Sequence, residues 1–374
     1  MPQSAPIPTI GVEEEYQLVC PQTGALKSEC QHVMDNLQGP IKADIQNELF
    51  LNTIEMASPV CQTLDDVRTS LNETRAAIIR SAEGLGFALA SAATNPLILP
   101  DDSQTTPKDR YHALMERFQQ IARDMFIFGC HVHVAMPEKE MGVAVMNRSR
   151  RWLPFLLALT TNSPFWNGHD TGYASFRREM WTQWPMAGPP PHFESVQDYQ
   201  SCVSELVRCG AIKDESFIYW DIRLPTKVPT IEFRGADVLS RVEETVAYAG
   251  LVRAVVMKCE DDEIQGLPVP PVRHSVLTYA MWHAARFGMH RSYVDPATNA
   301  RVDFPSVAES VLQELGPVLD RAGDRDCVER FIRECVEQGT GADRQRKSAG
   351  GDAMDLVNVV RQVIKETKQP GLQN

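Results

Sequence analysis

The sequence lacks long apolar segments and a secretory leader. Its 374 residues contain no run of roughly 18 apolar residues, the length that a membrane helix needs. The best apolar run, 152–159, is far shorter and contains Pro154. The first residues have neither the basic segment nor the apolar segment of a signal peptide. We therefore expect a cytoplasmic protein that does not contact membranes.

Paired cysteines and excess basic charge are also missing. The nine cysteines are scattered without a C-x-x-C pair, which is typical of reduced thiols in a cytoplasm. Acidic residues number 49 and basic residues 37, so the formal net charge is −12. This balance argues against a general nucleic-acid-binding protein, because the phosphate backbone would be repelled. It does not exclude ATP, whose charge is accompanied by a metal ion.

Common nucleotide and hydrolase motifs are absent as well. There is no Gly-Lys dipeptide and hence no P-loop, and there is no G-x-G-x-x-G, H-E-x-x-H or G-x-S-x-G. If the protein handles a nucleotide, metal ions must hold the phosphates in place of a glycine-rich loop.

The order of the predicted elements favours an α+β fold. A regular alternation of strands and helices is absent, and the helices cluster towards the carboxyl end. We expect a lead-in at 1–8 and a single domain over 9–368, with helices packed on a largely antiparallel sheet. Strands are predicted at 9–19, 47–57, 87–93, 125–136, 218–223 and 229–238. Helices are predicted at 63–83, 108–123, 143–159, 195–209, 242–259, 273–288, 305–321, 326–338 and 352–366, with a long loop at 162–193.

The first predicted strand carries three consecutive glutamates. Glu13 and Glu15 point to the same face, about 6.8 Å apart along the strand, whereas Glu14 interrupts the opposite, apolar face. That spacing suits two neighbouring metal ions that each take one carboxylate. A solvated polar face is the alternative interpretation.

Two further glutamates lie in the next β-rich segment. Glu48 and Glu55 are seven residues apart, so one regular strand would place them on opposite faces. They reach one site only if a bend or bulge separates them, or if Glu48 precedes the strand. Glu55 lies between Ile54 and Met56, and a glutamate in such an apolar stretch needs a partner.

Two later strands add histidines, a glutamate and an arginine. His131 and His133 share one strand face, which makes a metal site about as probable as a hydrogen-bonded core position. Glu232 and Arg234 share a face of the strand at 229–238 and could hold a metal and a phosphoryl group side by side. A cross-strand ion pair is the simpler alternative.

These segments resemble the glutamate–cysteine ligase superfamily, and most closely its YbdK-type carboxylate–amine ligase branch. The similarity is collinear and extends over nearly the whole chain. The matching strings are GVEEEYQLV (11–19), NELFLNTIE (47–55), GCHVHV (129–134), NSPFWNGHDTGYASFR (162–177), WDIRLP (220–225), PTIEFRGADV (229–238) and GTGADRQR (339–346).

The resemblance implies a glutamine-synthetase-like fold, in which a curved, mainly antiparallel sheet with helices packed outside forms a funnel for Mg-ATP. The domain at 9–368 would then be one ATP-dependent ligase domain. The metal ligands implied by motif position are Glu13, Glu15, Glu48, Glu55, His131 and Glu232.

The same resemblance implies roles for the other residues of the site. Glu232 and Arg234 would be catalytic, with Arg234 also contacting ATP as it steadies the transferred phosphoryl group. Arg177 would meet the substrate carboxylate, with Arg178 as a substitute, and His133 would assist in binding substrate. Arg344 or Arg346 would reach the ATP phosphates, or else their segment ends a helix with a solvated basic tail.

The implied reaction is ATP-dependent amide formation through an acyl phosphate. Its cofactor would be Mg²⁺ or Mn²⁺, and its substrates would be ATP, a small-molecule carboxylate and an amine. Glutamate and cysteine are the family default, and a homodimer is implied. Two alternatives stay open: a metal-dependent hydrolase that uses His131 and His133, and a non-catalytic nucleotide- or metabolite-binding protein on the same fold.

Overall fold

The computed structural model describes residues 6–39, 41, 44–97, 103–350 and 354–370. Within them, a seven-stranded sheet has the order β10-β11-β5-β1-β3-β2, and β4 also pairs with β1. Every pairing in this sheet is antiparallel, which confirms the expected α+β class. Its strands are β1 (Ile10–Val19), β2 (Ile45–Asn47), β3 (Thr53–Ala57), β4 (Ala88–Ala90), β5 (Gly129–Ala135), β10 (Ile222–Arg223) and β11 (Thr230–Asp237).

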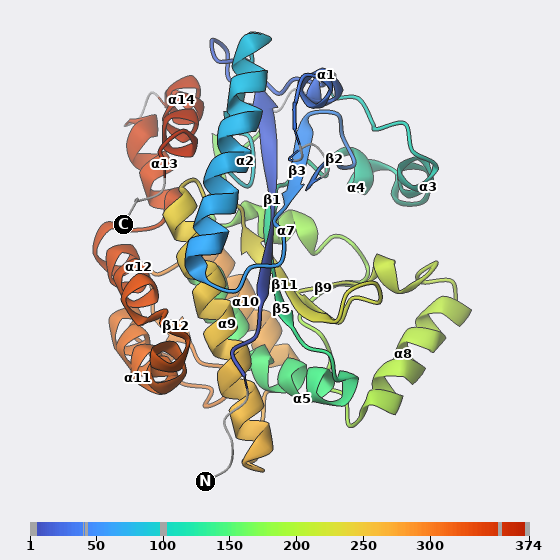
Figure 1. Cartoon of the computed structure of the whole chain (residues 1–374), viewed down its shortest axis with the longest axis vertical. Helices are drawn as coiled ribbons and strands as arrows, with labels where there is room; N and C mark the ends of the chain where they lie inside the picture. The colour runs from blue at the N-terminus through green and yellow to red at the C-terminus, as the bar shows by residue number, and fades with distance from the viewer. Residues whose placement is uncertain (1–5, 40, 42–43, 98–102, 351–353, 371–374) are drawn as a thin grey trace.

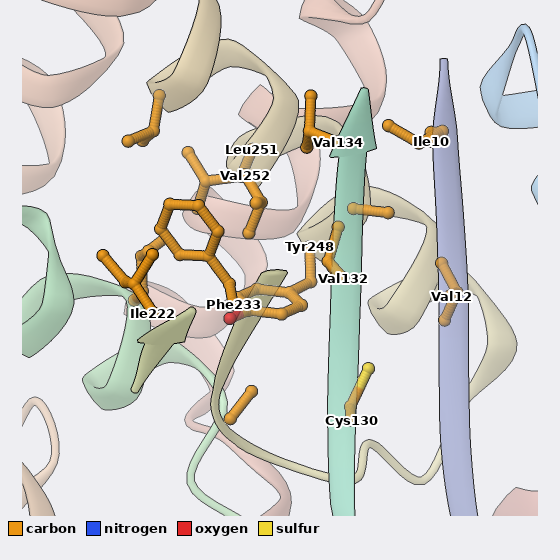
Figure 2. Packing of buried hydrophobic residues seen from close by; sticks show 14 of the residues in the cluster. Ile10, Val12, Cys130, Val132, Val134, Ile222, Phe233, Tyr248, Leu251 and Val252 are labelled. Carbon is orange, nitrogen blue, oxygen red and sulfur yellow. The ribbon is translucent and has the colours of Figure 1, made fainter. Parts of the chain in front are cut away.

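One face of this sheet is packed against helices. Ile10, Val12, Tyr16 and Leu18 alternate along β1 and are buried, as a half-polar strand requires. Figure 2 shows Val132 and Val134 of β5 beside this row, with Tyr248 from the covering helix α9. The predicted alternation of β1 is therefore confirmed, and it divides the sheet into an apolar face and a polar face.

Two long helices cover the apolar face, and shorter helices form a second layer behind them (Figure 1). The first of them begins at a capping box in which Thr63 and Asp66 satisfy each other's backbone N–H groups. The covering helices are α2 (Leu64–Gly84) and α9 (Val242–Ile264), and α11 (Phe304–Ala322) and α12 (Arg325–Gln338) lie behind α9. Three further helices pack elsewhere: α6 (Leu153–Leu159) on β11, α14 (Leu356–Thr367) on β4, and α13 (Gly341–Ala349) on α14.

Shorter elements complete the chain. Figure 1 places α3 and α8 on the side of β1 opposite to α2 and α9. The remaining helices are α1 (Cys30–Asp35), α3 (Asp109–Phe118), α4 (Gln120–Arg123), α5 (Lys139–Ser149), α7 (Phe176–Trp181), α8 (Val196–Arg208), α10 (His274–Phe287) and two 3₁₀ turns, η3 (Arg150–Trp152) and η4 (Glu215–Phe217). Three two-stranded sheets join β6 (Phe165–Trp166) to β7 (His169–Asp170), β8 (Ala187–Gly188) to β9 (Tyr219–Trp220) and β12 (Tyr293–Val294) to β13 (Arg301–Val302).

Several predicted boundaries were wrong. The segment 47–57 is not one strand, because β2 ends at Asn47 and β3 begins at Thr53. The helix predicted over 108–123 breaks at Gln119, whose φ of 50° lies outside the helical region. The loop at 162–193 contains helix α7, and α1 and α13 were not predicted. Among the described residues, no helix combines the length and apolarity needed to cross a bilayer.

Candidate active site

Strand register brings the predicted residues together on the polar face of the sheet. Glu13 of β1 lies opposite His131 of β5, and His133 of β5 lies opposite Glu232 of β11. Glu232 is in turn opposite Arg223 of β10. Because strand side chains alternate in direction, these five residues lie on the same face of the sheet.

A second row crosses the same face further along β1. Glu15 lies opposite Glu55 of β3, and Glu55 lies opposite Gln46 of β2. The Gln46 Nε2 atom donates a 2.7 Å hydrogen bond to Glu55. Glu48 lies in the turn between β2 and β3, so of the two arrangements expected for it, the one in which it precedes the strand is correct.

These rows border a cavity of about 350 Å³. Residues from α3, α7 and the loops around β9 and β10 form its other walls. The polar lining residues include Glu13, Glu15, Glu48, Glu55, His131, His133, Arg110, Arg177, Arg223, Arg234 and Lys227, and the apolar ones include Leu114, Met125, Ile127, Trp181, Trp184 and Tyr219.

Three of these groups are close enough to share a metal ion. One ligand atom each from Glu13, His133 and Glu232 lie within 4.8 Å of one another. The His133 Nε2 atom is buried and has no hydrogen-bond partner, and it lies 3.2 Å from Glu13 Oε1. The His133 Nδ1 atom is 3.0 Å from Thr230 Oγ1, a contact that fixes the orientation of the ring. A buried nitrogen without a partner among carboxylates fits a divalent cation.

The second histidine lies beside the same two carboxylates. His131, expected as the metal ligand, has its Nδ1 atom 3.0 Å from Glu13 and 3.7 Å from Glu232. Burial, with the charge of Arg234, lowers the pKa of His131 to about 4, so the ring is neutral at pH 7. Both histidines therefore adjoin Glu13, but His133 is the one that belongs to the three-residue cluster.

The remaining carboxylates are crowded. Burial raises the pKa of Glu15 to about 7, and the charge of Glu48 adds to this effect. Burial also raises the pKa of Glu55 well above its ordinary value, reinforced by Glu48, Glu13 and Glu15. The raised pKa values of Glu15 and Glu55 thus come first from burial and then from repulsion by neighbouring carboxylates, and bound cations would offset both.

Glu232 is held by arginines. Burial opposes its charge, but Arg234 and Arg223 hold the pKa of Glu232 at about 2. Arg223 Nη2 is 2.7 Å from the Glu232 carboxylate, and Arg234 Nη1 pairs with its other oxygen. Glu232 is therefore a permanently charged group at pH 7 between two cations.

Arg177 reaches the cavity from α7 with most of its guanidinium group unpaired. Its side chain is only 2% exposed, yet Nε and Nη1 have no hydrogen-bond partner. Its guanidinium carbon lies 5.6 Å from the ring centre of Trp181, and that of Arg234 lies 5.7 Å from the same ring. A Cβ at Gly129 would approach Arg177 Nη2 to 2.3 Å, so a larger residue here would displace the guanidinium group. Unpaired buried donors beside a cavity fit an anionic ligand.

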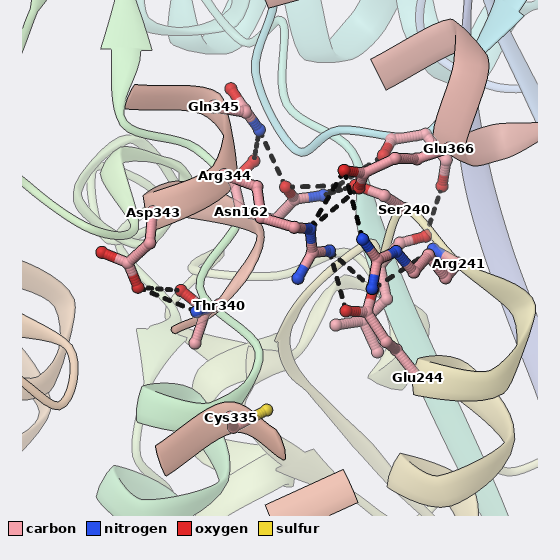
Figure 3. A network of polar contacts seen from close by, with 12 residues as sticks. Asn162, Ser240, Arg241, Glu244, Cys335, Thr340, Asp343, Arg344, Gln345 and Glu366 are labelled. Atoms are coloured by element: carbon pink, nitrogen blue, oxygen red, sulfur yellow. Dashed lines mark hydrogen bonds and ion pairs between the residues drawn. The ribbon is translucent and has the colours of Figure 1, made fainter. Parts of the chain in front are cut away.

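Two arginines expected to contact ligands are occupied elsewhere. Arg178 makes a 2.5 Å ion pair with buried Asp221. Arg344 pairs with Glu244 at 2.7 Å and with Glu366 at 3.0 Å, in the network of Figure 3, and does not line the cavity. The expectation that Arg344 contacts ATP is therefore wrong for this geometry. The reason is that its segment forms helix α13 between α9 and α14 rather than a loop or a helix end.

Sequence reasoning missed Arg223, and it left open whether the tryptophans of the loop at 162–193 shape a pocket or pack under the loop. Arg223 belongs to the WDIRLP string but received no role, because its pairing with Glu232 depends on the register of β10 with β11. Trp181 and Trp184 line the cavity, whereas Trp166 packs against Phe176 with ring centres 5.7 Å apart. The clustering of tryptophans in one segment was the available sequence signal for Trp181 and Trp184.

Comparisons with known proteins agree with this geometry. Residues 9–365 match the family described as Glutamate-cysteine ligase family 2 (GCS2). A protein of Rhodopirellula baltica with the provisional name glutamate–cysteine ligase 2 is 56% identical over 366 residues, which cover 96% of this chain and 97% of that protein. A similarly named protein of a Mycobacterium species is 39% identical over 360 residues, covering 94% and 97%.

Two solved structures have a similar fold. A glutamate–cysteine ligase of Francisella tularensis in complex with AMP superposes with a TM-score of 0.74 at 13% identity, covering 98% of this chain and 90% of that one. A bifunctional glutathione synthetase of Pasteurella multocida has a TM-score of 0.72 at 15% identity, covering 96% and 52%.

Proposed function

The chain belongs to glutamate-cysteine ligase family 2, and from this premise we propose that it is an ATP-dependent ligase that joins a small-molecule carboxylate to an amine. One observation carries the proposal. A single cavity brings four glutamates and two histidines together with Arg234 and the largely unpaired Arg177. Metal-bound ATP and an anionic substrate are the ligands that such a mixture of charges can hold together.

The acidic residues would hold Mg²⁺ or Mn²⁺. The partnerless His133 Nε2 atom beside Glu13 and Glu232, and the crowding of Glu15, Glu48 and Glu55, support this donor set, in which His131 adjoins Glu13. When bound, such cations would offset the negative charge of the ATP phosphates.

Arginines would direct the first chemical step. Arg177 would orient the carboxylate, one oxygen of which attacks the γ-phosphorus of ATP as the bond to the β-phosphate oxygen breaks and ADP leaves. Arg234, kept in place by Glu232, would donate hydrogen bonds to the transferred phosphoryl oxygens. The amine would then attack the carbonyl carbon of the acyl phosphate, lose a proton and expel inorganic phosphate.

Glutamate and cysteine are the first substrates to test, because the relatives' names refer to them. The metal-dependent hydrolase and the non-catalytic binding protein are less well supported, since the whole chain is similar to ligases. We also propose that residues 9–368 act as one catalytic domain, and that the protein is a cytoplasmic homodimer, which light scattering on the purified protein would test.

The deciding experiment measures Mg²⁺-dependent ADP release against a matrix of carboxylates and amines. Glu232→Gln removes the charge between Arg223 and Arg234 and should lower turnover by at least about 10²-fold. Glu309→Gln is the matched control, because Glu309 is exposed and pairs only with surface Arg333. A folded Glu232→Gln protein with full activity would refute the proposed role. No ADP release with any substrate pair, in a protein that binds Mg-ATP, would favour a binding function.

A further inference from the structure

The conspicuous GTGADRQR string lies outside the cavity, in helix α13. The first residues of this helix pack against Thr161 and Asn162. Ala342 N donates a 3.0 Å hydrogen bond to the Thr161 carbonyl, and the hydroxyl groups of Thr340 and Thr161 are 2.8 Å apart. A Cβ at Gly341 would lie 2.1 Å from Asn162 Oδ1, so the helix can approach this closely only with glycine there.

One side chain of α13 holds Asn162 from a second direction. Gln345 Nε2 donates to the Asn162 carbonyl oxygen at 2.9 Å and to Asn162 Oδ1 at 2.8 Å (Figure 3). Asn162 is fully buried and Gln345 is 2% exposed, so water cannot replace these bonds. Asn162 Nδ2 also donates to the Val238 carbonyl at 2.7 Å.

Asn162 in turn belongs to a cluster around Asp237, at the end of β11. Asn162 N and Ser163 Oγ each donate to Asp237 Oδ2 at 2.7 Å. Ser175 Oγ donates to Asp237 Oδ1 at 2.8 Å. The Asp237 carboxylate therefore joins Asn162 and Ser163 to Ser175, which caps helix α7.

The same serines fix the start of α7, which carries Arg177. Arg177 N donates to Ser163 Oγ at 3.0 Å, and Arg178 N donates to Ser175 Oγ at 3.3 Å. A continuous series of buried hydrogen bonds thus runs from Gln345 through Asn162, Asp237 and the two serines to the backbone of Arg177.

We propose that α13 is a positioning element for Arg177, which acts through Asn162 and Asp237 and touches no substrate itself. The placement of α7 is a property of the fold alone, whereas its effect on carboxylate binding rests on the proposed function. The string GTGADRQR would therefore serve the site indirectly, through Gly341 and Gln345, rather than by contact with ATP.

The test compares three variants of the full-length protein. Gln345→Met removes the donor to Asn162, and Gly341→Ala pushes against Asn162 from the other side. Asn147→Leu is the matched control: Asn147 also carries a buried amide, but its hydrogen bonds join it to the Phe193 backbone, and none among the described residues joins it to Asn162 or α13. If Gln345→Met does not fold, Gln345→Glu, which keeps the shape of the side chain, takes its place.

Two measurements separate this proposal from the proposed function. Hydrogen exchange of the backbone amides in 175–181 should be at least about tenfold faster in both α13 variants than in wild type, and unchanged in Asn147→Leu. The KM for the carboxylate should rise about tenfold in the same two variants, with little change in the KM for ATP.

Each outcome has a distinct meaning. Exchange in 175–181 that is unchanged in both α13 variants, or equally fast in Asn147→Leu, would overturn the positioning role. A rise in the KM for ATP equal to that for the carboxylate would also overturn it. Faster exchange in the α13 variants alone, together with a wild-type protein that turns over no substrate pair, would support the positioning role and reject the proposed function.

Discussion

Two neighbouring glutamates of β1 have opposite surroundings. Glu14 faces the helices and is fully buried, and Arg75 of α2 donates hydrogen bonds of 2.6 and 3.0 Å to its two oxygens. Thr245 of α9 donates a third, at 2.6 Å. Arg75 also donates to the backbone carbonyls of Leu239 and Ser240. The charge of Glu14 is therefore balanced entirely within the protein.

Glu15, one residue along, faces the cavity. It accepts a hydrogen bond from Gly129 N and lies opposite another carboxylate, that of Glu55. Burial and Glu48 raise its pKa to about 7. Glu14 on the core face of β1 therefore joins helices to the sheet. The carboxylates on the cavity face are instead available to bind ligands.

The largest effect is expected when the Glu14 carboxylate, the counter-charge of Arg75, is removed. Glu14→Gln leaves Arg75, which is 2% exposed, without a counter-charge. Loss of one partner from a buried ion pair typically costs about 3–5 kcal/mol, so the free energy of unfolding in denaturant should fall by that amount. The protein that remains folded should keep its KM values, because Glu14 does not reach the cavity.

Glu13→Gln is the matched variant on the other face. It should change stability in metal-free buffer by only about 1 kcal/mol, because Glu13 pairs directly with His131 and His133, and the arginines nearby keep Glu232 as their paired carboxylate. Turnover should instead fall by about 10²-fold or more. Equal losses of stability in the two variants would contradict the division between the faces.

The sequence predicted this division but not its partners. Alternation along 10–19 separates the two faces, and Glu14 stood out as an interruption of the apolar row. Arg75 is 61 residues away in the middle of a helix, and no local pattern marks it as the partner of Glu14. Alternation reports which way a side chain points, whereas pairing depends on how helices dock.

The same limit explains what was predicted of the cavity. Glu13, Glu15 and Glu55 were found from parity and from an apolar context, both of which are local. The contact of Arg344 with ATP was implied by the resemblance alone, and the Thr340–Asp343 capping box that starts a helix there was overlooked. Register between β10 and β11, which pairs Arg223 with Glu232, has no sequence signal.

A second prediction compares neighbouring residues of β5. Gly129 lies on the cavity side, where an added Cβ would meet Arg177 at 2.3 Å, whereas Cys130 is buried among the core residues of Figure 2. Gly129→Ala should displace Arg177 and raise the KM for the carboxylate about tenfold, with a smaller effect on the KM for ATP. Cys130→Ala should leave both KM values unchanged and lower stability by about 1 kcal/mol. A normal carboxylate KM in Gly129→Ala would show that Arg177 is not required where the structure places it.

The smallest expected effect is a pH dependence of stability that arises from Glu15 on the cavity face. The pKa of Glu15 rises from an ordinary 4.5 to about 7 in the folded protein. As pH increases between these two values the unfolded chain releases its proton first, so the metal-free protein becomes less stable. Because the cavity is partly open to solvent, we expect a loss on the order of 1 kcal/mol for this group.

Thermal unfolding at pH 5 and pH 8, with and without Mg²⁺, measures this effect. Glu15→Gln should be more stable than metal-free wild type at pH 8 and nearly equal to it at pH 5, because the amide cannot acquire the charge that burial opposes. Mg²⁺ should stabilise wild type at pH 8 more than it stabilises Glu15→Gln, since cations relieve the same repulsion that the substitution removes. If Glu15→Gln instead destabilised the protein equally at both pH values, the charge of Glu15 would be balanced within the protein, as that of Glu14 is. The two faces of β1 would then differ in their hydrogen bonds but not in charge balance.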